Sequence, residues 1–243
     1  GLEELLNTKI RCVDGWDRIT LRAGDQYVAV QEDGTLCLSD KADLFVKEDW
    51  GDGRINLRCE RTGKYVTTIS KGRRQSEEED GALVAVKDAA FDWFVTAIFH
   101  IIPAENGAVR LTNRFDQPIQ ISKDKKLYSA LTGEGSSFLM ETVVDGFEEV
   151  QHLMQCAKTV ILALGCHPMV NAKEEIDRTT LALPPHQEKL AKMICKIKPD
   201  AICVLFSNYP YTIHSVQNTL PAIVWSATGS QDMGTAMAQT LYG

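Results

Sequence analysis

The chain has 243 residues, 44% of them hydrophobic, and a formal net charge of −7 at pH 7. This length suits one large domain or two small ones, and the negative charge argues against a nucleic-acid-binding protein, because neutralising phosphates requires a basic face. No apolar stretch reaches the roughly 20 residues of a membrane-spanning helix, and the N-terminus lacks a basic segment followed by an apolar one.

The first half of the sequence, up to about residue 146, consists of short alternating apolar segments bounded by Gly, Asp and Asn. This pattern is typical of many short strands joined by turns. It also repeats, with copies that begin at Ile19, Ile55 and Val109. Each copy has an alternating strand, a polar turn, a second strand, a leucine beyond the next turn, and an aromatic strand centred on Phe45, Phe94 or Phe138.

The three copies predict a single closed body with pseudo-threefold symmetry, because no four-strand unit can bury its apolar face alone. We therefore predict a β-trefoil. The segments GKYV at residues 63–66 and YVAVQEDGTL at residues 27–36 resemble lobes of fascin-like trefoils, a group that includes actin bundlers and carbohydrate-binding modules.

The aromatic residues of this half allow two interpretations. Tyr27 and Tyr65 are expected to be strand residues that pack across lobes, since aromatic residues favour strands. An exposed aromatic residue such as Trp16 or Trp50 could instead stack on a sugar, although nothing in the sequence selects that role.

After about residue 148, apolar runs alternate with stretches of helical spacing, as in βαβ units around a parallel sheet. The runs cover residues 160–164, 202–206 and 222–225. Pro184 and Pro185 mark the start of a predicted helix over residues 185–197, and a closing helix runs to Leu241. The predicted fold class is thus an all-β trefoil followed by an incomplete α/β domain of the parallel-sheet sandwich type.

Polar loops follow the three predicted strands of this second half. Loops beyond the carboxyl ends of parallel strands gather at one edge of an open α/β sheet, where ligands bind. The first loop lies within NAKEEIDRTTLALPPHQE at residues 171–188 and contains the adjacent carboxylates Glu174 and Glu175. The other loops contain SNYP at residues 207–210 and SATGSQ at residues 226–231. A merely solvated loop is the plain alternative to a site.

Other kinds of site have little support in the sequence. No glycine-rich phosphate motif follows a strand, and His167, His186 and His214 lack metal-ligand spacing. Cys166 has no third orienting group, so a thiol nucleophile is not expected. We predict no cofactor and no metal. Seven cysteines without a CxxC pair favour a reducing, cytoplasmic setting over a disulfide framework.

Three segments carry a resemblance to a known family. They occur in order, as VILALGCHPMVNAKEEIDRTTLALPPHQEKL, VLFSNYPYTI and PAIVWSATGSQDMGTAMAQTLYG. Together they resemble the C-terminal α/β sandwich domain of glycoside hydrolase family 3, the β-xylosidase and β-glucosidase group. This resemblance implies an exo-acting retaining β-glycosidase that acts on a carbohydrate substrate. The residues of the loop at 171–188 and of the SNYP segment favour the β-xylosidase branch.

The resemblance also implies roles for individual residues. Glu174 matches the general acid/base glutamate, and Asp177 and Arg178 match a pair implied to help bind substrate. Members more often have glycine where this sequence has Glu175, so which glutamate acts stays open. The nucleophilic aspartate and most of the sugar pocket are implied to lie in an N-terminal (β/α)₈ domain of the same protein.

The domain prediction follows from both lines of reasoning. Residues 1–11 are expected to be the remnant of the first helix of the α/β domain, residues 12–147 an inserted trefoil, and residues 148–243 the α/β domain. The chain alone is then expected to be inactive. Two other readings remain: a carbohydrate-binding trefoil on a non-catalytic scaffold, or a trefoil that serves as a spacer or as a contact in a homo-oligomer.

Overall fold

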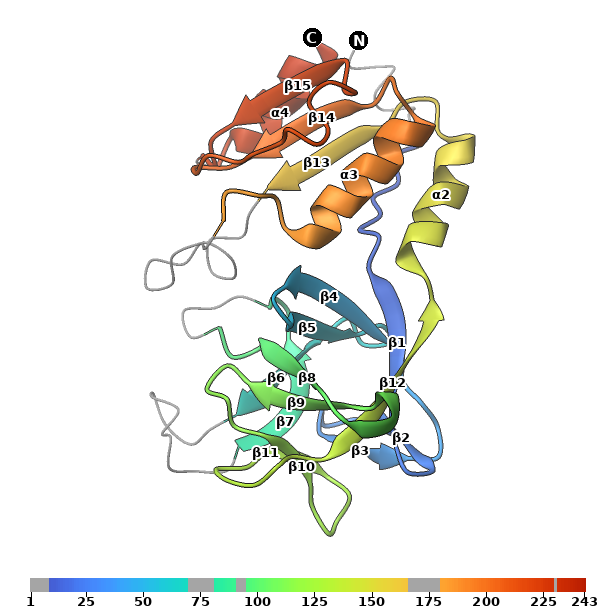
Figure 1. The fold of residues 1–243 in the computed structure, drawn as a ribbon, viewed down its shortest axis with the longest axis vertical. Helices are drawn as coiled ribbons and strands as arrows, with labels where there is room; N and C mark the ends of the chain where they lie inside the picture. Colours follow the sequence, from blue (N-terminus) through green and yellow to red (C-terminus); the bar gives the residue numbers. More distant parts are fainter. Residues whose placement is uncertain (1–8, 70–80, 91–94, 166–179, 230) are drawn as a thin grey trace. The chain divides into compact units, whose positions relative to one another are not determined.

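The computed structural model describes residues 9–69, 81–90, 95–165, 180–229 and 231–243 (Figure 1). Contacts divide the chain into two compact units. We call residues 15–149 the β unit, and residues 9–14, 150–165 and 180–243 the α/β unit.

The β unit has twelve strands within the described residues. They are β1 (Asp17–Ala23), β2 (Gln26–Val30), β3 (Leu36–Ser39), β4 (Phe45–Gly51), β5 (Arg54–Cys59), β6 (Tyr65–Ile69), β7 (Gly81–Lys87), β8 (Phe99–Pro103), β9 (Val109–Asn113), β10 (Ile119–Ile121), β11 (Leu127–Ser129) and β12 (Ser137–Val144). Six of them pair in the order β1, β4, β5, β8, β9 and β12. The last of these, β12, also pairs with the first, β1. The antiparallel sheet is therefore closed as a six-stranded barrel.

The other six strands form three hairpins outside this barrel: β2 with β3, β6 with β7, and β10 with β11. Each successive set of four strands thus gives its first and last strand to the barrel and its middle two to a hairpin, as the predicted four-strand repeat requires. The hairpins also bond to one another, because the Ala85 N–H donates to the Gly34 carbonyl and the Leu38 N–H to the Lys125 carbonyl, each at 2.8 Å. β11 pairs with β7 as well.

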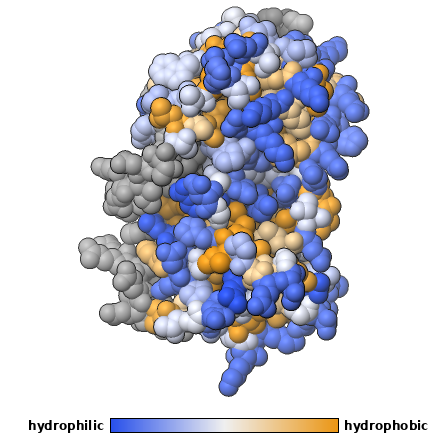
Figure 2. All heavy atoms as spheres, viewed as in Figure 1, coloured by the Kyte–Doolittle hydropathy of each residue, from blue (hydrophilic) through white to orange (hydrophobic). Residues whose placement is uncertain are grey.

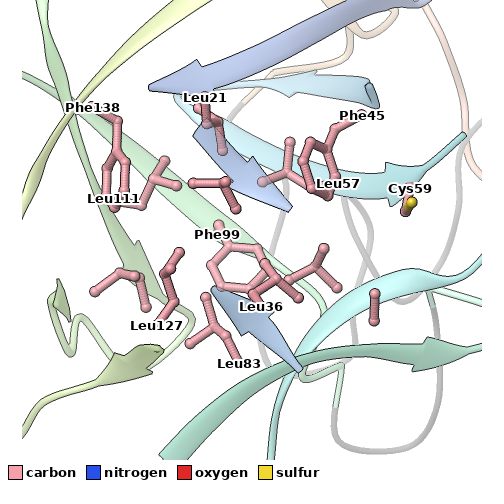
Figure 3. Close-up of a cluster of buried hydrophobic side chains, with 14 of the residues drawn as sticks. Leu21, Leu36, Phe45, Leu57, Cys59, Leu83, Phe99, Leu111, Leu127 and Phe138 are labelled. Atoms are coloured by element: carbon pink, nitrogen blue, oxygen red, sulfur yellow. The ribbon is translucent and has the colours of Figure 1, made fainter. Parts of the chain in front are cut away.

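The barrel core contains one fully buried phenylalanine from the fourth strand of each set, namely Phe45, Phe99 and Phe138 (Figure 3). Buried leucines surround them, including Leu21, Leu36, Leu57, Leu83, Leu111 and Leu127. Burying one such side chain stabilises the fold by about 1.5–3 kcal/mol. This shared interior explains why three copies of the unit are stable together.

The structure corrects the register of the second aromatic strand. The sequence prediction centred it on Phe94, which lies outside the described residues, whereas β8 begins at Phe99. Several aromatic and apolar residues of FDWFVTAIF, residues 91–99, satisfy the local pattern equally. The register instead depends on pairing of Phe99 with Ile55 of β5 and Asn113 of β9.

The two tryptophans are built into the β unit. The Trp50 indole N–H donates to Asn56 Oδ1 at 2.7 Å, and the ring packs on Val95 and Ile98. The ring of Trp16 lies 5.8 Å from that of Trp50, centroid to centroid. Both residues are partly buried, so the sugar-stacking alternative gains no support from them.

Tyr65 connects two of the four-strand sets, as expected for a residue that packs across lobes. Its hydroxyl, on β6, donates to the Glu48 carboxylate on β4 at 2.7 Å, and the Arg58 Nε lies 3.5 Å from the same oxygen. Burial, followed by the hydrogen bond to Glu48, raises the pKa of Tyr65 to about 12. The phenol therefore stays protonated and donating at neutral pH.

Asp43, between β3 and β4, holds a second connection between these sets. Its carboxylate accepts hydrogen bonds from Arg61 Nε and Nη2 at 2.8 Å each, and from the Val30 N–H at 2.8 Å. The bonds from Arg61 lower the pKa of Asp43 from its ordinary value. The carboxylate is therefore favoured in the folded state.

Replacing this carboxylate is expected to weaken the β unit in a pH-dependent way. At pH 7, Asp43→Asn should lower the free energy of unfolding by about 1 kcal/mol, because Arg61 is half exposed and the charge-assisted bond is partly screened. The pKa of Asp43 is lower in the folded than in the unfolded state. The contribution of its carboxylate to stability is therefore fully present above the unfolded-state pKa, about 3.9, and is lost as the pH falls through the folded-state pKa. Urea unfolding at pH 7 and pH 3 checks this, with exposed Asp124→Asn as the control. Equal differences at both pH values would contradict it.

The α/β unit has a parallel sheet in the order β13 (Ile161–Gly165), β14 (Ile202–Phe206) and β15 (Ala222–Ser226). Its helices are α3 (Pro185–Ile197) and α4 (Met233–Tyr242), and α2 (Gly146–Cys156) begins in the β unit and continues into the α/β unit. The three strands, α3 and the closing helix were predicted. The helix α2 was not, and it begins where the Asp145 carboxylate accepts hydrogen bonds from the Phe147 and Glu148 N–H groups.

One face of this sheet carries its core. Leu162 and Leu164 of β13 are in register with Cys203 and Leu205 of β14, and all four are buried. They belong to one buried cluster with residues of α2 and α3, namely Val150, Met154, Ala191, Ile194 and Cys195. On the edge strand β15, Ile223 and Trp225 remain exposed.

The surface in view mixes hydrophobic and hydrophilic side chains (Figure 2). Among the described residues, no helix is both long and apolar enough to span a membrane.

Candidate functional site

The carboxyl ends of the three parallel strands meet at one edge of the sheet. Gly165 ends β13 in register with Phe206 of β14, and Phe206 is in register with Ser226 of β15. The three strands that precede the polar segments in the sequence therefore end side by side. This is the edge at which open α/β sheets bind ligands.

The residues predicted for catalysis lie outside the described residues. Glu174, Asp177 and Arg178, together with Glu175, fall within residues 166–179, so the structure neither brings them together nor separates them. The described chain ends at Gly165 on one side of this segment and resumes at Thr180 on the other. The geometry available for the site is that of these two ends and of the neighbouring strand ends.

The first end is held by a side-chain amide. The Gly165 N–H donates to Gln187 Oε1 at 2.9 Å, and Gln187 Nε2 donates to the Gly165 carbonyl at 2.7 Å. Gln187 lies in the first turn of α3. One side chain therefore satisfies both backbone groups of the last residue of β13.

Glycine is required at the end of β13 by close packing. A Cβ atom at Gly165 would lie 2.3 Å from the carbonyl oxygen of Phe206, a backbone atom that no side-chain rotation can move. The two strands therefore approach each other closely at the point where the chain leaves the sheet.

The second end is held by the backbone. The Thr212 N–H donates to the Leu181 carbonyl at 2.8 Å, and Ala182 forms a parallel bridge with Thr212. Leu183 then enters the core, where it is 3% exposed. Both ends of the segment that contains Glu174 are thus tied to the α/β unit.

The loops after β14 and β15 are joined by polar side chains. Asn208 Oδ1 accepts a hydrogen bond from the Thr228 N–H at 2.9 Å. The Ser207 hydroxyl donates to the Tyr209 carbonyl at 2.7 Å and lies 2.9 Å from the Tyr209 N–H. We call Gly165, Gln187, Ser207, Asn208 and Thr228 the strand-end cluster.

The polar side chains of the strand-end cluster bond mainly to the strand ends and loops themselves: the Gln187 amide bonds to Gly165, and the fully buried Ser207 bonds to Tyr209. Sequence reasoning identified the loops of Ser207, Asn208 and Thr228 but missed Gln187. The only local signal for Gln187 was its place just after the two prolines that begin α3, a position from which a long side chain can reach a neighbouring strand end.

Two titratable groups of the α/β unit, Glu188 and Cys203, have shifted pKa values with structural causes. The hydrogen bond from Lys192, followed by that from Ser215, lowers the pKa of Glu188. Burial, with a smaller effect of Cys195, raises the pKa of the Cys203 thiol to about 11. A thiol with so high a pKa is a poor nucleophile at neutral pH.

The histidines weighed in the sequence are separately engaged where the structure describes them. His186 Nε2 lies 3.1 Å from the Asp14 carbonyl, and His214 Nδ1 lies 3.3 Å from Gln217 Nε2. His167 and Cys166 are outside the described residues. Within the described part of the chain, no three His, Cys, Asp or Glu residues are grouped so that they could hold a metal ion.

A parallel sheet with flanking helices and a polar carboxyl edge defines an α/β domain of the kind that presents residues to a ligand. The sequence matches the glycosyl hydrolase family 3 C-terminal domain over residues 28–243. The chain therefore belongs to that family. The matched range includes most of the β unit as well as the α/β unit.

Among solved structures, the chain is similar to a salivary protein from Culex quiquefasciatus of the Cysteine and Tryptophan-Rich (CWRC) family. The two sequences are 11% identical, the TM-score is 0.41, and the match covers 54% of this chain and 99% of the other.

Proposed function

We propose that this chain provides the acid/base part of an exo-acting, retaining β-glycosidase of the β-xylosidase or β-glucosidase type. Membership of the glycosyl hydrolase family 3 C-terminal domain family is the observation that carries this proposal. The place of Glu174, in the segment that begins at the carboxyl edge after Gly165, supports it.

Hydrolysis with retention needs two carboxyl groups about 5–5.5 Å apart across the anomeric carbon. Glu174 would protonate the glycosidic oxygen as the bond to the anomeric carbon breaks, and it would later remove a proton from the attacking water. Asp177 and Arg178 would bind substrate. The nucleophile would be an aspartate of a (β/α)₈ domain in the same protein, so this chain alone would be inactive.

The β unit fits this proposal as an inserted domain. Its closed six-stranded barrel with three outer hairpins is the arrangement of a β-trefoil, and we assign it to the fascin-like kind from the segments at residues 27–36 and 63–66. In this reading the trefoil extends over residues 12–147 and the catalytic domain over residues 148–243, after a helix remnant at residues 1–11.

The direct test uses the full-length protein on aryl β-xylosides and aryl β-glucosides, with the anomeric form of the first product followed by NMR. We expect release of the terminal sugar as the β-anomer. An α-anomer as first product would show inversion and would contradict the proposed roles. A failure to hydrolyse both the xyloside and the glucoside series would also contradict the proposal.

The rival role, a carbohydrate-binding trefoil on a non-catalytic scaffold, has less support. Trp50, one of the two residues that could have stacked on a sugar, packs on Val95 and Ile98 and donates its indole N–H to Asn56. Polysaccharide affinity that disappears when residues 17–146 are removed, with glycosidase activity absent from the full-length protein, would favour this rival. A change of oligomeric state alone would favour a spacer or contact role.

A further inference from the structure

The helix α2 starts beside the chain that leads into the first strand of the β unit. A Cβ atom at Gly146 would lie 2.3 Å from the Gly15 carbonyl oxygen and 2.5 Å from the Trp16 carbonyl carbon, so these two chain segments pass in close contact. The Gly146 N–H also donates to Asp17 Oδ1 at 3.1 Å, across a sequence separation of 129 residues. The first residue of α2 is therefore held by the start of β1.

Carboxylates accept hydrogen bonds from the N–H groups of the first three residues of α2. Asp145 Oδ1 accepts from the Phe147 N–H at 2.8 Å and from the Glu148 N–H at 3.1 Å. Asp17 accepts from the residue before them, Gly146. The first N–H groups of an α-helix have no partner within the helix, and negative charge is favourable at that end. Asp17 is thus a helix cap supplied by a distant part of the sequence.

An ion pair holds the last residue of this first turn. Arg18 Nη1 lies 2.9 Å from Glu149 Oε2, and it also donates to the Trp16 carbonyl at 2.7 Å. The Arg18 side chain is only 17% exposed, so the pair is partly shielded from water. The strand β1 therefore contributes two consecutive side chains, Asp17 and Arg18, to the first turn of α2.

The rest of α2 contributes to the core of the α/β unit. Val150 and Met154 are 3% and 4% exposed, and they belong to the same buried cluster as Leu162 of β13 and Cys203 of β14. Isolated helices shorter than about 12–15 residues are marginal in water. A helix of 11 residues therefore depends on tertiary contacts, and α2 has them in both units.

We propose that α2 couples the stabilities of the two units, and that Asp17 is the residue through which the β unit acts. Loss of the cap frays the first turn of α2. Fraying weakens the packing of Val150, which is the next residue of the helix and part of the α/β core. The two-state element that both units bias is this turn, which is either formed or frayed. The inference does not depend on the proposed glycosidase role.

The test measures amide hydrogen exchange in the full-length protein carrying Asp17→Ala. We expect exchange in α2, and also in β14 of the α/β unit, to accelerate by about 2–30-fold, the factor that corresponds to loss of a helix N-cap. Asp17→Asn retains a side-chain oxygen that can accept from Gly146, so its exchange should stay within about twofold of wild type.

Asp49→Ala is the matched control. Asp49 is a partly buried aspartate of the β unit whose Oδ1 likewise accepts from a backbone N–H, that of Gly51, at 3.0 Å. This bond lies at the turn between β4 and β5 and involves no residue of α2. Asp49→Ala should therefore leave exchange in β14 unchanged.

Gly146→Ala tests the same coupling without removing a carboxylate. Alanine is a better helix former than glycine, so a helix uncoupled from β1 would gain stability and exchange more slowly. Because the new Cβ would meet the Gly15 carbonyl oxygen, we expect faster exchange in both α2 and β14 instead.

Three results would overturn the coupling: faster exchange in α2 with unchanged exchange in β14, equal acceleration of β14 in Asp49→Ala, or slower exchange in Gly146→Ala. If Asp17→Ala does not fold, the comparison of Gly146→Ala with Asp49→Ala decides the question by the same criteria. None of these measurements uses glycosidase activity, so they stand whether or not the proposed function does.

Discussion

Glu174→Gln in the full-length protein is expected to lower kcat/KM for a glycoside with a poor leaving group by about 10²–10⁴-fold, the usual contribution of general acid–base catalysis. Glutamine keeps the size of the side chain but cannot transfer a proton to the departing oxygen. An activated aryl glycoside needs little protonation, so formation of the glycosyl-enzyme should stay fast. The intermediate should then accumulate, because its hydrolysis still requires the base.

A pre-steady-state burst of aryl alcohol measures these two steps separately. Glu175→Gln is the matched control, since it removes the neighbouring carboxylate while leaving Glu174. We expect its rates to stay within a few-fold of wild type. If Glu175→Gln shows the large loss and Glu174→Gln does not, the acid/base assignment moves to Glu175. If neither does, the catalytic carboxyl lies elsewhere in the protein.

Phe99→Ala is expected to lower the free energy of unfolding of the β unit by about 3–5 kcal/mol. Phe99 is fully buried beside leucines of several strands, so truncation removes apolar contacts and leaves a cavity that the closed barrel cannot easily fill (Figure 3). Phe45 and Phe138 hold the equivalent positions of the other two sets. The same substitution at either should have a similar cost.

Phe115→Ala is the control for this prediction. Phe115 lies in the turn between β9 and β10, is 39% exposed and contacts the Arg114 guanidinium, so its loss should cost about 0.5 kcal/mol or less. Urea unfolding followed by tryptophan fluorescence compares the two variants, since Trp16 and Trp50 report on the β unit. Equal stability of Phe99→Ala and Phe115→Ala would show that the core is not built around Phe99.

Much of the secondary structure could be predicted from the sequence, because it depends on local pattern. Alternation around Ile19, Ile55 and Val109 predicted barrel strands that the structure shows as β1, β5 and β9. Two prolines followed by residues at helical spacing predicted α3 with its observed start at Pro185. Three uninterrupted apolar runs predicted the parallel strands β13, β14 and β15, although β13 begins and ends one residue later than predicted.

For the candidate site, the sequence and the tertiary structure contribute different residues. The roles of Glu174, Asp177 and Arg178 come from resemblance to a family to which the chain belongs, and they remain proposals. The tertiary structure contributes the edge where the strands end together and the pairing of Gly165 with Gln187. Sequence reasoning missed Gln187 because a glutamine at the start of a helix has no local pattern that names its partner.

The sequence by itself determined where most of the strands and the helices α3 and α4 form, and that the first half repeats, since these follow from the spacing of apolar residues along the chain. Only the tertiary structure decided that β8 starts at Phe99, that β12 closes the barrel onto β1, and that Trp50 packs on Val95 and Ile98. Each of these depends on a contact between residues far apart in the chain. Local periodicity is satisfied equally by several registers, and pairing with distant strands selects among them.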